Sequence, residues 1–503
     1  MSRVLNPALR QKITTAEQAA ALIRPGMNVG MSGFTGSGYP KAVPQALAAQ
    51  IKAAHDRGEA FMIGLWTGAS TAPELDGALA EVDGVSFRTP YQSDPIMRRK
   101  INEGITEYDD IHLSHLAPMV WAGSMGPLDV AVIEVTAIKP DGTLVPSSSV
   151  GNNKTYLDLA DKVILEVNSW QSADLEGMHD VYYGTRLPPD RMPVLLTHAG
   201  DRIGVRNYRV DPDRVVAVVE TDAPDRNTPF KPVDDASRAI AEFYLDFLTN
   251  EVQHGRLPGD LLPLQSGVGN VANAVLTGLL DGPFDYLTSY TEVIQDGMVD
   301  LIDAGKMTVA SATAFSLSPD YAAKMNNQAR HYRDKIVLRP QEISNHPEMI
   351  RRLGVIACNG MIEADIYGNV NSTHIMGSRL QNGIGGSADF ARNAYISAFV
   401  TPSTAKGGAI SAIVPMVSHH DHTEHDVQVL ITEQGLADLR GKSPKQRARL
   451  IIDKCAHPDY REMLKEYYEH ALATANGLHT PHDLRRSLSW HIRYLETGTM
   501  KPS

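Results

Sequence analysis

Apolar, strand-like runs alternate with helical patterns along the whole chain. The run "NVGMSGF" is followed by the helical pattern "KAVPQALAAQIKAAHDRG", and "FMIGLWTG" precedes "TAPELDGALAE". Two further runs, "KVILEVN" and "RVVAVVE", have the length and composition of short buried strands. This alternation predicts an α/β protein in which mostly parallel sheets are covered by helices.

The length of the chain predicts two domains. A single hydrophobic core rarely grows beyond about 250–300 residues, and this chain has 503. Prolines cluster between Pro224 and Pro232, immediately before an amphipathic helical pattern. Because such a cluster is typical of a linker, we expect one domain over residues 1–224 and a second over residues 225–503.

The second half of the chain repeats features of the first in the same order. A strand, a glycine-rich turn and a helix are expected in both "GMSGFTGSGYPKAVPQAL" and "LQSGVGNVANAVLTGL". An Ile-Glu strand with a glycine turn recurs in "VIEVTAIKPDGTLVPSSS" and "MIEADIYGNVNSTH", and "KVILEVN" corresponds to "VQVLITEQ". The order favours two similar domains that arose by duplication. The alternative is that any two α/β domains share such features.

Charge and cysteine content exclude several classes of protein. The formal net charge of -12 argues against non-specific binding to nucleic acid. Only Cys358 and Cys455 are present, which excludes a disulfide scaffold and a zinc site of the usual cysteine type. No run of about 18 apolar residues predicts a membrane span, and the N-terminal segment lacks the apolar core of a signal peptide. We therefore expect a cytoplasmic protein, with a short organelle transit peptide as the alternative.

Two glycine-rich turns are candidates for ligand binding. They are "SGVGNVANAV", from Ser266 to Val275, and "QNGIGGSADFARNAY", from Gln381 to Tyr395. The free amides at the start of a helix bind anions or a developing oxyanion. Neither turn has the Gly-Lys-Ser/Thr ending of a nucleotide-binding P-loop. Taken alone, each turn fits a tight strand-to-helix connection equally well.

Glu292, in "SYTEVIQDG", follows the strand-like run from Phe284 to Tyr290. In open α/β sheets, ligands bind at the carboxyl ends of the strands, where a carboxylate can act as a general base or a nucleophile. Alternatively, Glu292 lies in the first turn of a helix and is stabilised by the helix dipole. The local pattern favours this second interpretation.

Other polar features have simpler interpretations. The segment "HHDHTEH", from His419 to His425, lies between strand-like runs and fits no helical metal motif, so we expect a polar loop and no metal site. Cys358 lies in an apolar strand pattern and is expected to be buried and unreactive. His457 and His482 are expected at helix caps or in loops.

In order along the chain, the segments "SGVGNVANAV", "SYTEVIQDGM", "NGIGGSADFAR" and "STAKGG" resemble the acetyl-CoA hydrolase/transferase family. Within it they are most similar to the class I CoA-transferases that use succinyl-CoA and acetate. The segments "GFTGSGYPKAVP", "LEGMHD", "SNHPEMIRRLG" and "ITEQGLADLRG" extend the resemblance over nearly the whole chain. The resemblance implies two CoA-transferase-type α/β domains and a homodimer.

The resemblance also implies a mechanism in which Glu292 is the nucleophile. Glu292 would attack the acyl-CoA thioester to give an acyl-glutamyl anhydride, and the CoA thiolate would then form a glutamyl-CoA thioester. The implied reaction converts succinyl-CoA and acetate to acetyl-CoA and succinate, with coenzyme A as a substrate and no tightly bound cofactor. One alternative is an acetyl-CoA hydrolase of the same family. An alternative of another class is a non-catalytic, acyl-CoA-binding regulatory protein.

Individual roles follow from the resemblance, motif by motif. Contacts to CoA are implied for Gly267, Val268, Gly269, Asn270, Val271, Asn382, Gly386 and Lys406. Val268, whose amide is similar to an oxyanion-hole donor, and Gly386 would join Glu292 at the catalytic centre. The substrate pocket would contain Ser70, Arg226, Asn345 and Glu433. Arg226 suits a substrate carboxylate, because the guanidinium fork matches its geometry.

Overall fold

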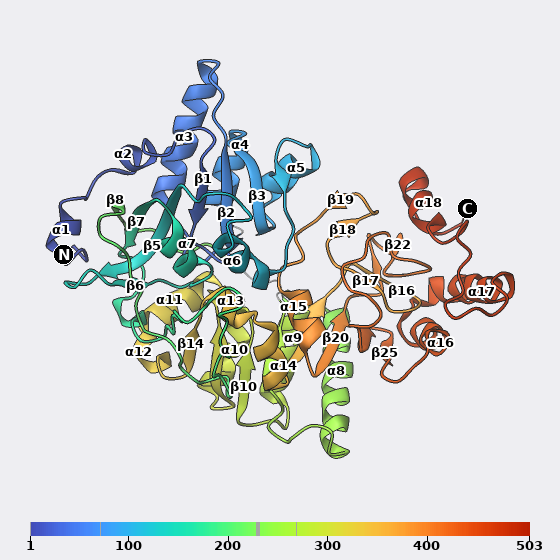
Figure 1. The fold of residues 1–503 in the computed structure, drawn as a ribbon. Helices are drawn as coiled ribbons and strands as arrows, with labels where there is room; N and C mark the ends of the chain where they lie inside the picture. The colour runs from blue at the N-terminus through green and yellow to red at the C-terminus, as the bar shows by residue number, and fades with distance from the viewer. Residues whose placement is uncertain (1, 71, 228–231, 268, 503) are drawn as a thin grey trace. The chain divides into compact units, whose positions relative to one another are not determined.

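The computed structural model describes residues 2–70, 72–227, 232–267 and 269–502. Figure 1 labels its helices and strands along the chain. Contacts between residues divide the chain into two compact units. The first unit comprises Met1–Pro229, Thr288–Asp303 and Met307–Leu353, and the second comprises Phe230–Leu287, Ala304–Lys306 and Gly354–Ser503. The units therefore do not follow the single boundary expected near residue 225. Two segments of the second half, one of which contains Glu292, pack with the first half.

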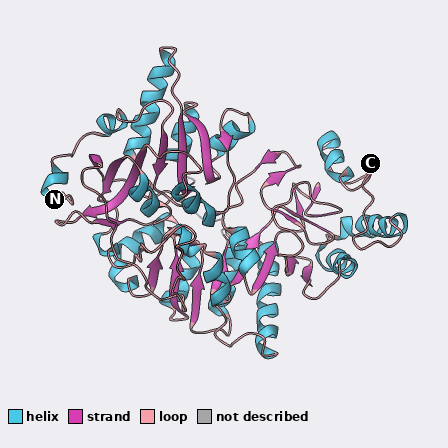
Figure 2. Ribbon diagram, in the orientation of Figure 1, coloured by secondary structure: helices cyan, strands magenta, loops and turns pink. Residues whose placement is uncertain are grey.

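The N-terminal part of the first unit is built on one sheet, and Figure 2 draws the strands of the protein in magenta. The order of the strands in this sheet is β4-β3-β2-β1-β5-β7-β8. The pairs along this order are parallel, and β6 adds to β5 as an antiparallel hairpin. This confirms the predicted α/β class. The strands are β1 (Asn28–Met31), β2 (Ile63–Ser70), β3 (Val85–Gln92), β4 (Glu107–Tyr108), β5 (Val130–Ile138), β6 (Leu144–Pro146), β7 (Lys162–Asn168) and β8 (Val215–Thr221). The helices are α1 (Pro7–Arg10), α2 (Ala16–Ala20), α3 (Ala42–Asp56), α4 (Ala78–Glu81), α5 (Pro95–Asn102), α6 (Leu113–Trp121) and α7 (Asn153–Leu159), with a π-helical turn η1 (Pro73–Gly77) and a 3-10 turn η2 (Ala173–Leu175).

Helices cover both faces of this sheet. Val29 and Met31 of β1 belong to a buried cluster that includes Leu47 of α3. Because side chains alternate along a strand, a side chain at Gly30, between them, would lie on the opposite face of the sheet. There the ring of Tyr156 in α7 lies so close that a Cβ atom on Gly30 would be 2.9 Å from it. A side chain at Gly30 would push α7 off the sheet.

The remaining elements of the first unit come from the second half of the chain. Three of the strands among these elements follow the order β14-β12-β10. Two others, β11 and β13, form a separate parallel pair. The strands are β10 (Leu287–Tyr290), β11 (Val293–Gln295), β12 (Met307–Ala312), β13 (Ala314–Ser316) and β14 (Ile336–Leu338). The helices are α10 (Asp296–Asp303), α11 (Pro319–Asn327), α12 (Ala329–Tyr332), α13 (Gln341–Ser344) and α14 (Pro347–Leu353).

The second unit contains the strand order β9-β15-β20-β24-β25, in which only the last pair is antiparallel. A large apolar cluster packs around α16 and α17. The strands are β9 (Leu264–Ser266), β15 (Ile356–Gly360), β16 (Glu363–Asp365), β17 (Val370–Asn371), β18 (His374–Ile375), β19 (Arg379–Leu380), β20 (Ile396–Val400), β21 (Thr404–Ala405), β22 (Ile410–Ser411), β23 (Ile413–Val414), β24 (Val429–Thr432) and β25 (Gly435–Asp438). The helices are α8 (Asp235–Gln253), α9 (Asn270–Asp281), α15 (Ser387–Asn393), α16 (Pro444–Cys455), α17 (Pro458–Thr474) and α18 (Ser489–Thr497).

Strand order supports the predicted duplication. In the first sheet, the fourth, third and second strands in sequence are neighbours, as are the first, fifth and later strands. If only the strands of the two orders given above for the second half are counted, starting with β9, then β10, β12 and β14 are the second, third and fourth, and β15, β20 and β24 are the fifth and later strands. The second half of the chain thus repeats both runs, as β14-β12-β10 and β9-β15-β20-β24. The antiparallel hairpins β5–β6 and β16–β17 occupy the two "Ile-Glu" segments that the sequence aligned. Two unrelated α/β domains would not be expected to share all of these features.

Helix caps agree with the sequence. Thr15 and Gln18 form a capping box at the start of α2, and His457 caps α17 by accepting from the Asp459 amide. These contacts satisfy amides that the first helical turn leaves unpaired. Within the described ranges, no helix has both the length and the apolar character needed to cross a bilayer.

Candidate active site

Glu292 lies between two strands and not in a helix. β10 ends at Tyr290, β11 begins at Val293, and α10 begins only at Asp296. The expectation of an acid in the first turn of a helix, which the local pattern favoured, is therefore wrong. The physical reason is that Val293–Gln295 is fully buried and pairs in parallel with β13, so tertiary pairing overrides the local helical pattern.

Hydrogen bonds fix both the backbone and the side chain of Glu292. Its carbonyl oxygen accepts from the amides of Thr313, at 2.9 Å, and Ala314, at 3.3 Å. Its carboxylate oxygen Oε1 accepts from Nδ2 of Asn345 at 2.8 Å. Asn345 is fully buried, so the carboxylate is oriented by a group that has little freedom of its own.

The amide of Asn345 is oriented in turn by its neighbour. Oγ of Ser344 donates to Oδ1 of Asn345 at 2.8 Å, which leaves the NH₂ group of that amide for Glu292. Ser344 ends α13, whose first residue, Gln341, donates from Nε2 to the carbonyl oxygen of Leu113 at 2.9 Å. The structure thus brings together two of the residues that the sequence assigned to the site, Glu292 and Asn345.

An apolar cluster surrounds this part of the first unit. Tyr91 packs against it, and its buried members are Phe34, Ala69, Leu113, Val293 and Ala314. Burial raises the pKa of the Tyr91 phenol, and the nearby Glu292 carboxylate raises it further. No sequence pattern marks Tyr91, which is one aromatic residue near the end of β3. Apolar side chains beside a carboxylate strengthen its electrostatic contacts and limit access of water.

Ser70 lies at the end of β2 but is engaged in a buried network. Its Oγ donates to Oδ2 of Asp76 at 2.7 Å, and Oδ1 of Asp76 pairs with Nε of Arg88 at 2.9 Å. All three side chains are fully buried. A buried ion pair needs its remaining lone pairs satisfied. The hydroxyl of Ser70 does this for the second carboxylate oxygen of Asp76, so Ser70 stabilises the Asp76–Arg88 pair. Its place in a substrate pocket stays a prediction.

Arg226 is exposed and pairs with a carboxylate of the same unit. Its side chain is 63% exposed, and Nε lies 2.9 Å from Oε1 of Glu74. Glu74 belongs to the π-helical turn η1, which follows β2. Glu74 has no motif that would mark it in the sequence, because an acid in a short helical turn has an ordinary structural explanation.

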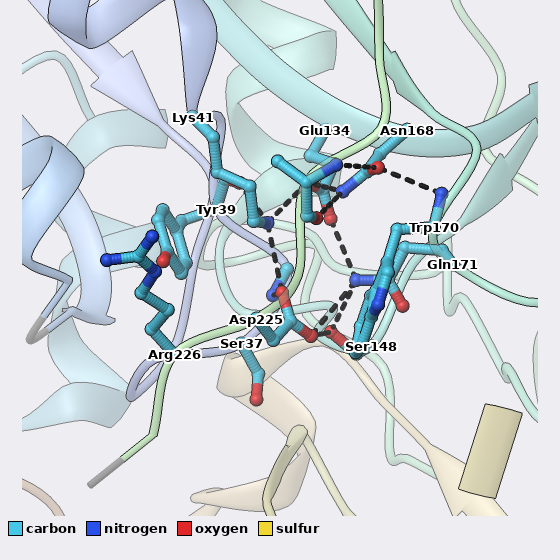
Figure 3. Close-up of polar contacts among 12 residues, drawn as sticks. Ser37, Tyr39, Lys41, Glu134, Ser148, Asn168, Trp170, Gln171, Asp225 and Arg226 are labelled. Carbon is cyan, nitrogen blue, oxygen red and sulfur yellow. Dashed lines mark hydrogen bonds and ion pairs between the residues drawn. The ribbon is translucent and has the colours of Figure 1, made fainter. Parts of the chain in front are cut away.

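A buried ionic cluster anchors the residue before Arg226 (Figure 3). Nζ of Lys41 lies 2.6 Å from Oε2 of Glu134 and 2.9 Å from Oδ1 of Asp225. Gln171 donates to both carboxylates, at 3.1 and 3.0 Å. Burial raises the pKa of Glu134 to about 7, although the Lys41 ammonium opposes that shift. Sequence reasoning missed this cluster because its members are far apart in the chain and share no motif.

The first glycine-rich turn of the second unit connects β9 to α9, as predicted. The Gly267 amide donates to the Cys358 carbonyl at 3.0 Å. Gly269 has a φ of 133°, a conformation that favours glycine, and Asn270 and Val271 open α9. Val268, predicted as an oxyanion-hole donor, lies outside the described residues. The role of this turn in binding CoA stays a prediction.

The second turn has the predicted helix after it. Asn382 donates from Nδ2 to the carbonyl oxygens of Ser372, at 3.1 Å, and Gly383, at 2.9 Å. Gly386 caps α15. Lys406 is exposed in the turn between β21 and β22, with a φ of 52°. Its ammonium group is therefore available on the surface of the second unit.

Glu433 follows β24 and is held in its charged form. Its carboxylate accepts from the Ser403 amide at 2.7 Å, from the Ser403 hydroxyl, and from Nε2 of Gln434 at 3.0 Å. Burial alone would raise the pKa of Glu433, but these hydrogen bonds outweigh it and lower the pKa. Glu292 belongs to the first unit and Glu433 to the second.

The remaining sequence candidates lie where a structural role is expected. His419–His425 forms a loop, as predicted, in which the His419 ring packs on His374 with the ring centres 3.9 Å apart. Across the described part of the chain, no three potential metal ligands gather at one point. Cys358 is buried, and burial raises the pKa of its thiol to about 12. This confirms the expectation of an unreactive thiol.

The fold and motifs define a family. Residues 3–220 match the model of the acetyl-CoA hydrolase/transferase N-terminal domain, and residues 323–468 match that of the C-terminal domain. The chain belongs to the acetyl-CoA hydrolase/transferase family, which confirms the resemblance stated from the sequence.

Individual relatives align over nearly the whole length. A succinyl-CoA:acetate CoA-transferase of Clostridium kluyveri is 50% identical, with 99% of this chain and 92% of the relative aligned. A propanoyl-CoA:succinate CoA transferase of Escherichia coli is 47% identical, with 97% and 98% aligned. The solved structure of RipA from Yersinia pestis matches with a TM-score of 0.71 and 23% identity, covering 94% of this chain and 99% of RipA. This last match supports the fold alone.

Proposed function

We propose that the enzyme is a CoA-transferase that moves CoA from succinyl-CoA to acetate, with Glu292 as the nucleophile. The observation that carries the proposal is the oriented carboxylate of Glu292, which accepts from Asn345 at 2.8 Å beside an apolar wall. The relatives that are 50% and 47% identical are a succinyl-CoA:acetate CoA-transferase and a propanoyl-CoA:succinate CoA transferase, which supports transfer of CoA between carboxylic acids.

The proposed reaction proceeds by four carbonyl additions that require no net proton or redox change. The Glu292 carboxylate attacks succinyl-CoA and expels the CoA thiolate, leaving a succinyl-glutamyl anhydride. The thiolate attacks the Glu292 carbonyl, releases succinate and forms glutamyl-CoA. Acetate then attacks the same carbonyl and expels the thiolate, which finally attacks the acetyl carbonyl to give acetyl-CoA and free Glu292.

Positioning matters more than basicity in this scheme. A carboxylate is a weak nucleophile, so holding it in an attacking geometry supplies much of the rate. Asn345 serves this purpose when Glu292 is charged. Each addition also creates an oxyanion, and loss of one amide donor to such an oxyanion can slow the reaction about 10²–10³-fold. We assign that task to the glycine-rich turns at Val268 and Gly386.

Hydrolysis of acetyl-CoA is the second candidate, because the family name covers hydrolases as well as transferases. Both activities begin with an anhydride on Glu292. In hydrolysis, water intercepts the anhydride or the glutamyl-CoA thioester, whereas in transfer the CoA thiolate attacks the anhydride and acetate then attacks the thioester. The apolar cluster that contains Phe34 and Leu113 favours exclusion of water and hence transfer.

The decisive experiment compares two rates with succinyl-CoA as donor. Acetyl-CoA formation is followed with acetate present, and release of free thiol is followed without any acceptor. Transfer predicts rapid acetyl-CoA formation and slow thiol release. Equal thiol release with and without acetate would instead identify a hydrolase. Propionate and butyrate as acceptors determine which acid the pocket prefers.

The proposal includes a homodimer in the cytoplasm. Light scattering coupled to size-exclusion chromatography measures the assembly directly, and a mass of one chain would reject the dimer.

A further inference from the structure

Glu74 already pairs with the guanidinium group of Arg226, to which the family resemblance assigns the binding of a substrate carboxylate. Nε of Arg226 and Oε1 of Glu74 are 2.9 Å apart. The two side chains differ in their surroundings, since that of Arg226 is 63% exposed and that of Glu74 only 15%. The Arg226 side chain can therefore move into solvent, whereas the Glu74 side chain cannot.

Glu74 is held in place from its other side. The phenol of Tyr39, which is fully buried, donates to Oε2 of Glu74 at 2.7 Å. Burial raises the pKa of Tyr39, and the contact with Glu74 raises it further. Tyr39 therefore stays protonated and remains a donor at any physiological pH. One oxygen of Glu74 is fixed by this donor while the other faces Arg226.

The backbone of Arg226 is also fixed. Its amide donates to the Gly36 carbonyl at 2.9 Å, and the Gly36 amide donates to Oδ1 of Asn227 at 2.8 Å. Asp225 is anchored by Lys41, as Figure 3 shows. A Cβ atom on Gly36 would lie 2.2 Å from the Arg226 carbonyl oxygen, so the two segments approach as closely as a glycine permits. The backbone at Arg226 is therefore held against Gly36, while its long side chain extends into solvent.

We propose that Glu74 is an intramolecular competitor that a substrate carboxylate must displace from Arg226, and that it thereby sets the affinity of the enzyme for the acid. Glu74 presents the same chemical group as acetate or succinate, and a guanidinium binds any carboxylate with the same fork. Because an exposed ion pair contributes only a small free energy, the competition lowers affinity by about two- to fivefold. This inference rests on the proposed role of Arg226.

The test measures the KM of the acid acceptor in Glu74→Gln. Glutamine keeps the shape of the side chain and can still accept from Tyr39, but it carries no charge. The KM for acetate and for succinate is expected to fall about two- to fivefold at low salt. The difference should shrink in 0.5 M salt, because screening weakens the pair in the parent enzyme. A fall for succinate alone also supports the competition and indicates that Arg226 receives the carboxylate remote from the reacting one.

Glu59→Gln is the matched control, since Glu59 forms an exposed pair with Arg57 at 2.7 Å elsewhere on the first unit. Its KM should equal that of the parent. Thermal melting of each variant shows that the fold is retained.

A double-variant cycle separates the inference from its premise. If Arg226→Gln raises the KM and abolishes the effect of Glu74→Gln, the competition is supported. If Arg226→Gln raises the KM but Glu74→Gln leaves it unchanged, the competition is rejected while Arg226 keeps its proposed role. If Arg226→Gln leaves the KM unchanged, both the assignment of Arg226 and the competition are rejected.

Discussion

Replacing Glu342 with glutamine should make the protein more stable at alkaline pH. Glu342 lies in α13, on the segment that carries Asn345, and it is 4% exposed. Neither of its carboxyl oxygens has a hydrogen-bond partner of good geometry among the described residues. Burial raises the pKa of Glu342 to about 7 from an ordinary value of 4.5, although the Lys154 ammonium pulls it down.

The expected size follows from this shift. A group whose pKa is raised by folding contributes stability that is fully present below its unfolded pKa and is lost as the pH rises through its folded pKa. A difference of about 2.5 pKa units corresponds to about 3 kcal/mol of unfolding free energy. The parent protein should lose most of this unfolding free energy between pH 5 and pH 8. Glutamine does not titrate, so the variant should not show that loss.

Urea unfolding at pH 5 and pH 8 tests the prediction. At each pH, the unfolding free energy of the parent is subtracted from that of Glu342→Gln. This difference should be larger at pH 8 than at pH 5 by roughly 2–3 kcal/mol. Glu348→Gln is the control, because Glu348 lies nearby in an exposed pair with Arg352 and should change stability by less than about 1 kcal/mol at either pH. A Glu342→Gln variant whose stability follows the pH profile of the parent would refute the argument from burial.

Other perturbations probe the site and its supports. Asn345→Ala removes the hydrogen bond to Glu292 and should slow formation of the glutamyl adduct about 10- to 150-fold in single-turnover assays; a rate within twofold of the parent would show that this contact does not position the nucleophile. Lys41→Met leaves Glu134 and Asp225 buried without their cation and should cost about 3–5 kcal/mol in urea unfolding, whereas a loss below 1 kcal/mol would mean that water reaches the cluster. Exhaustive dialysis against a chelator should leave the transfer rate unchanged, and a loss restored by one added metal would reverse the interpretation of the His419–His425 loop.

Much of the fold could be predicted because its signals are local. The strand at Lys162–Asn168 and the helix at Ala42–Asp56 are continuous patterns whose periodicity is sufficient to assign them. The surroundings of Glu292 could not be assigned in this way. The segment Val293–Gln295 is a strand only because it pairs with Ala314–Ser316, and no local window contains that information.

Part of the candidate site could likewise be predicted from the sequence, and part could not. The motif around Glu292 and the position of Asn345 came from resemblance, and the structure shows that they form a hydrogen bond. Partners such as Ser344 and Glu74 had no signal in the sequence. Each is an ordinary residue whose importance depends on a contact to a distant part of the chain, so only the folded arrangement reveals it.

The central claim is that the Glu292 carboxylate carries the acyl group and then CoA. Incubation with succinyl-CoA without an acceptor, followed by borohydride reduction and peptide mass spectrometry, measures it directly. Borohydride donates hydride to the carbonyl carbon of the glutamyl thioester, the C–S bond breaks and CoA leaves as its thiol, and the side chain becomes a primary alcohol. The peptide that carries the modified residue is therefore lighter than the same peptide with a free carboxylic acid. The modified residue should be Glu292, activity should fall in proportion to the modification, and Glu292→Gln should carry no modification. Modification of any other residue, or full turnover by Glu292→Gln, would show that Glu292 is not the nucleophile.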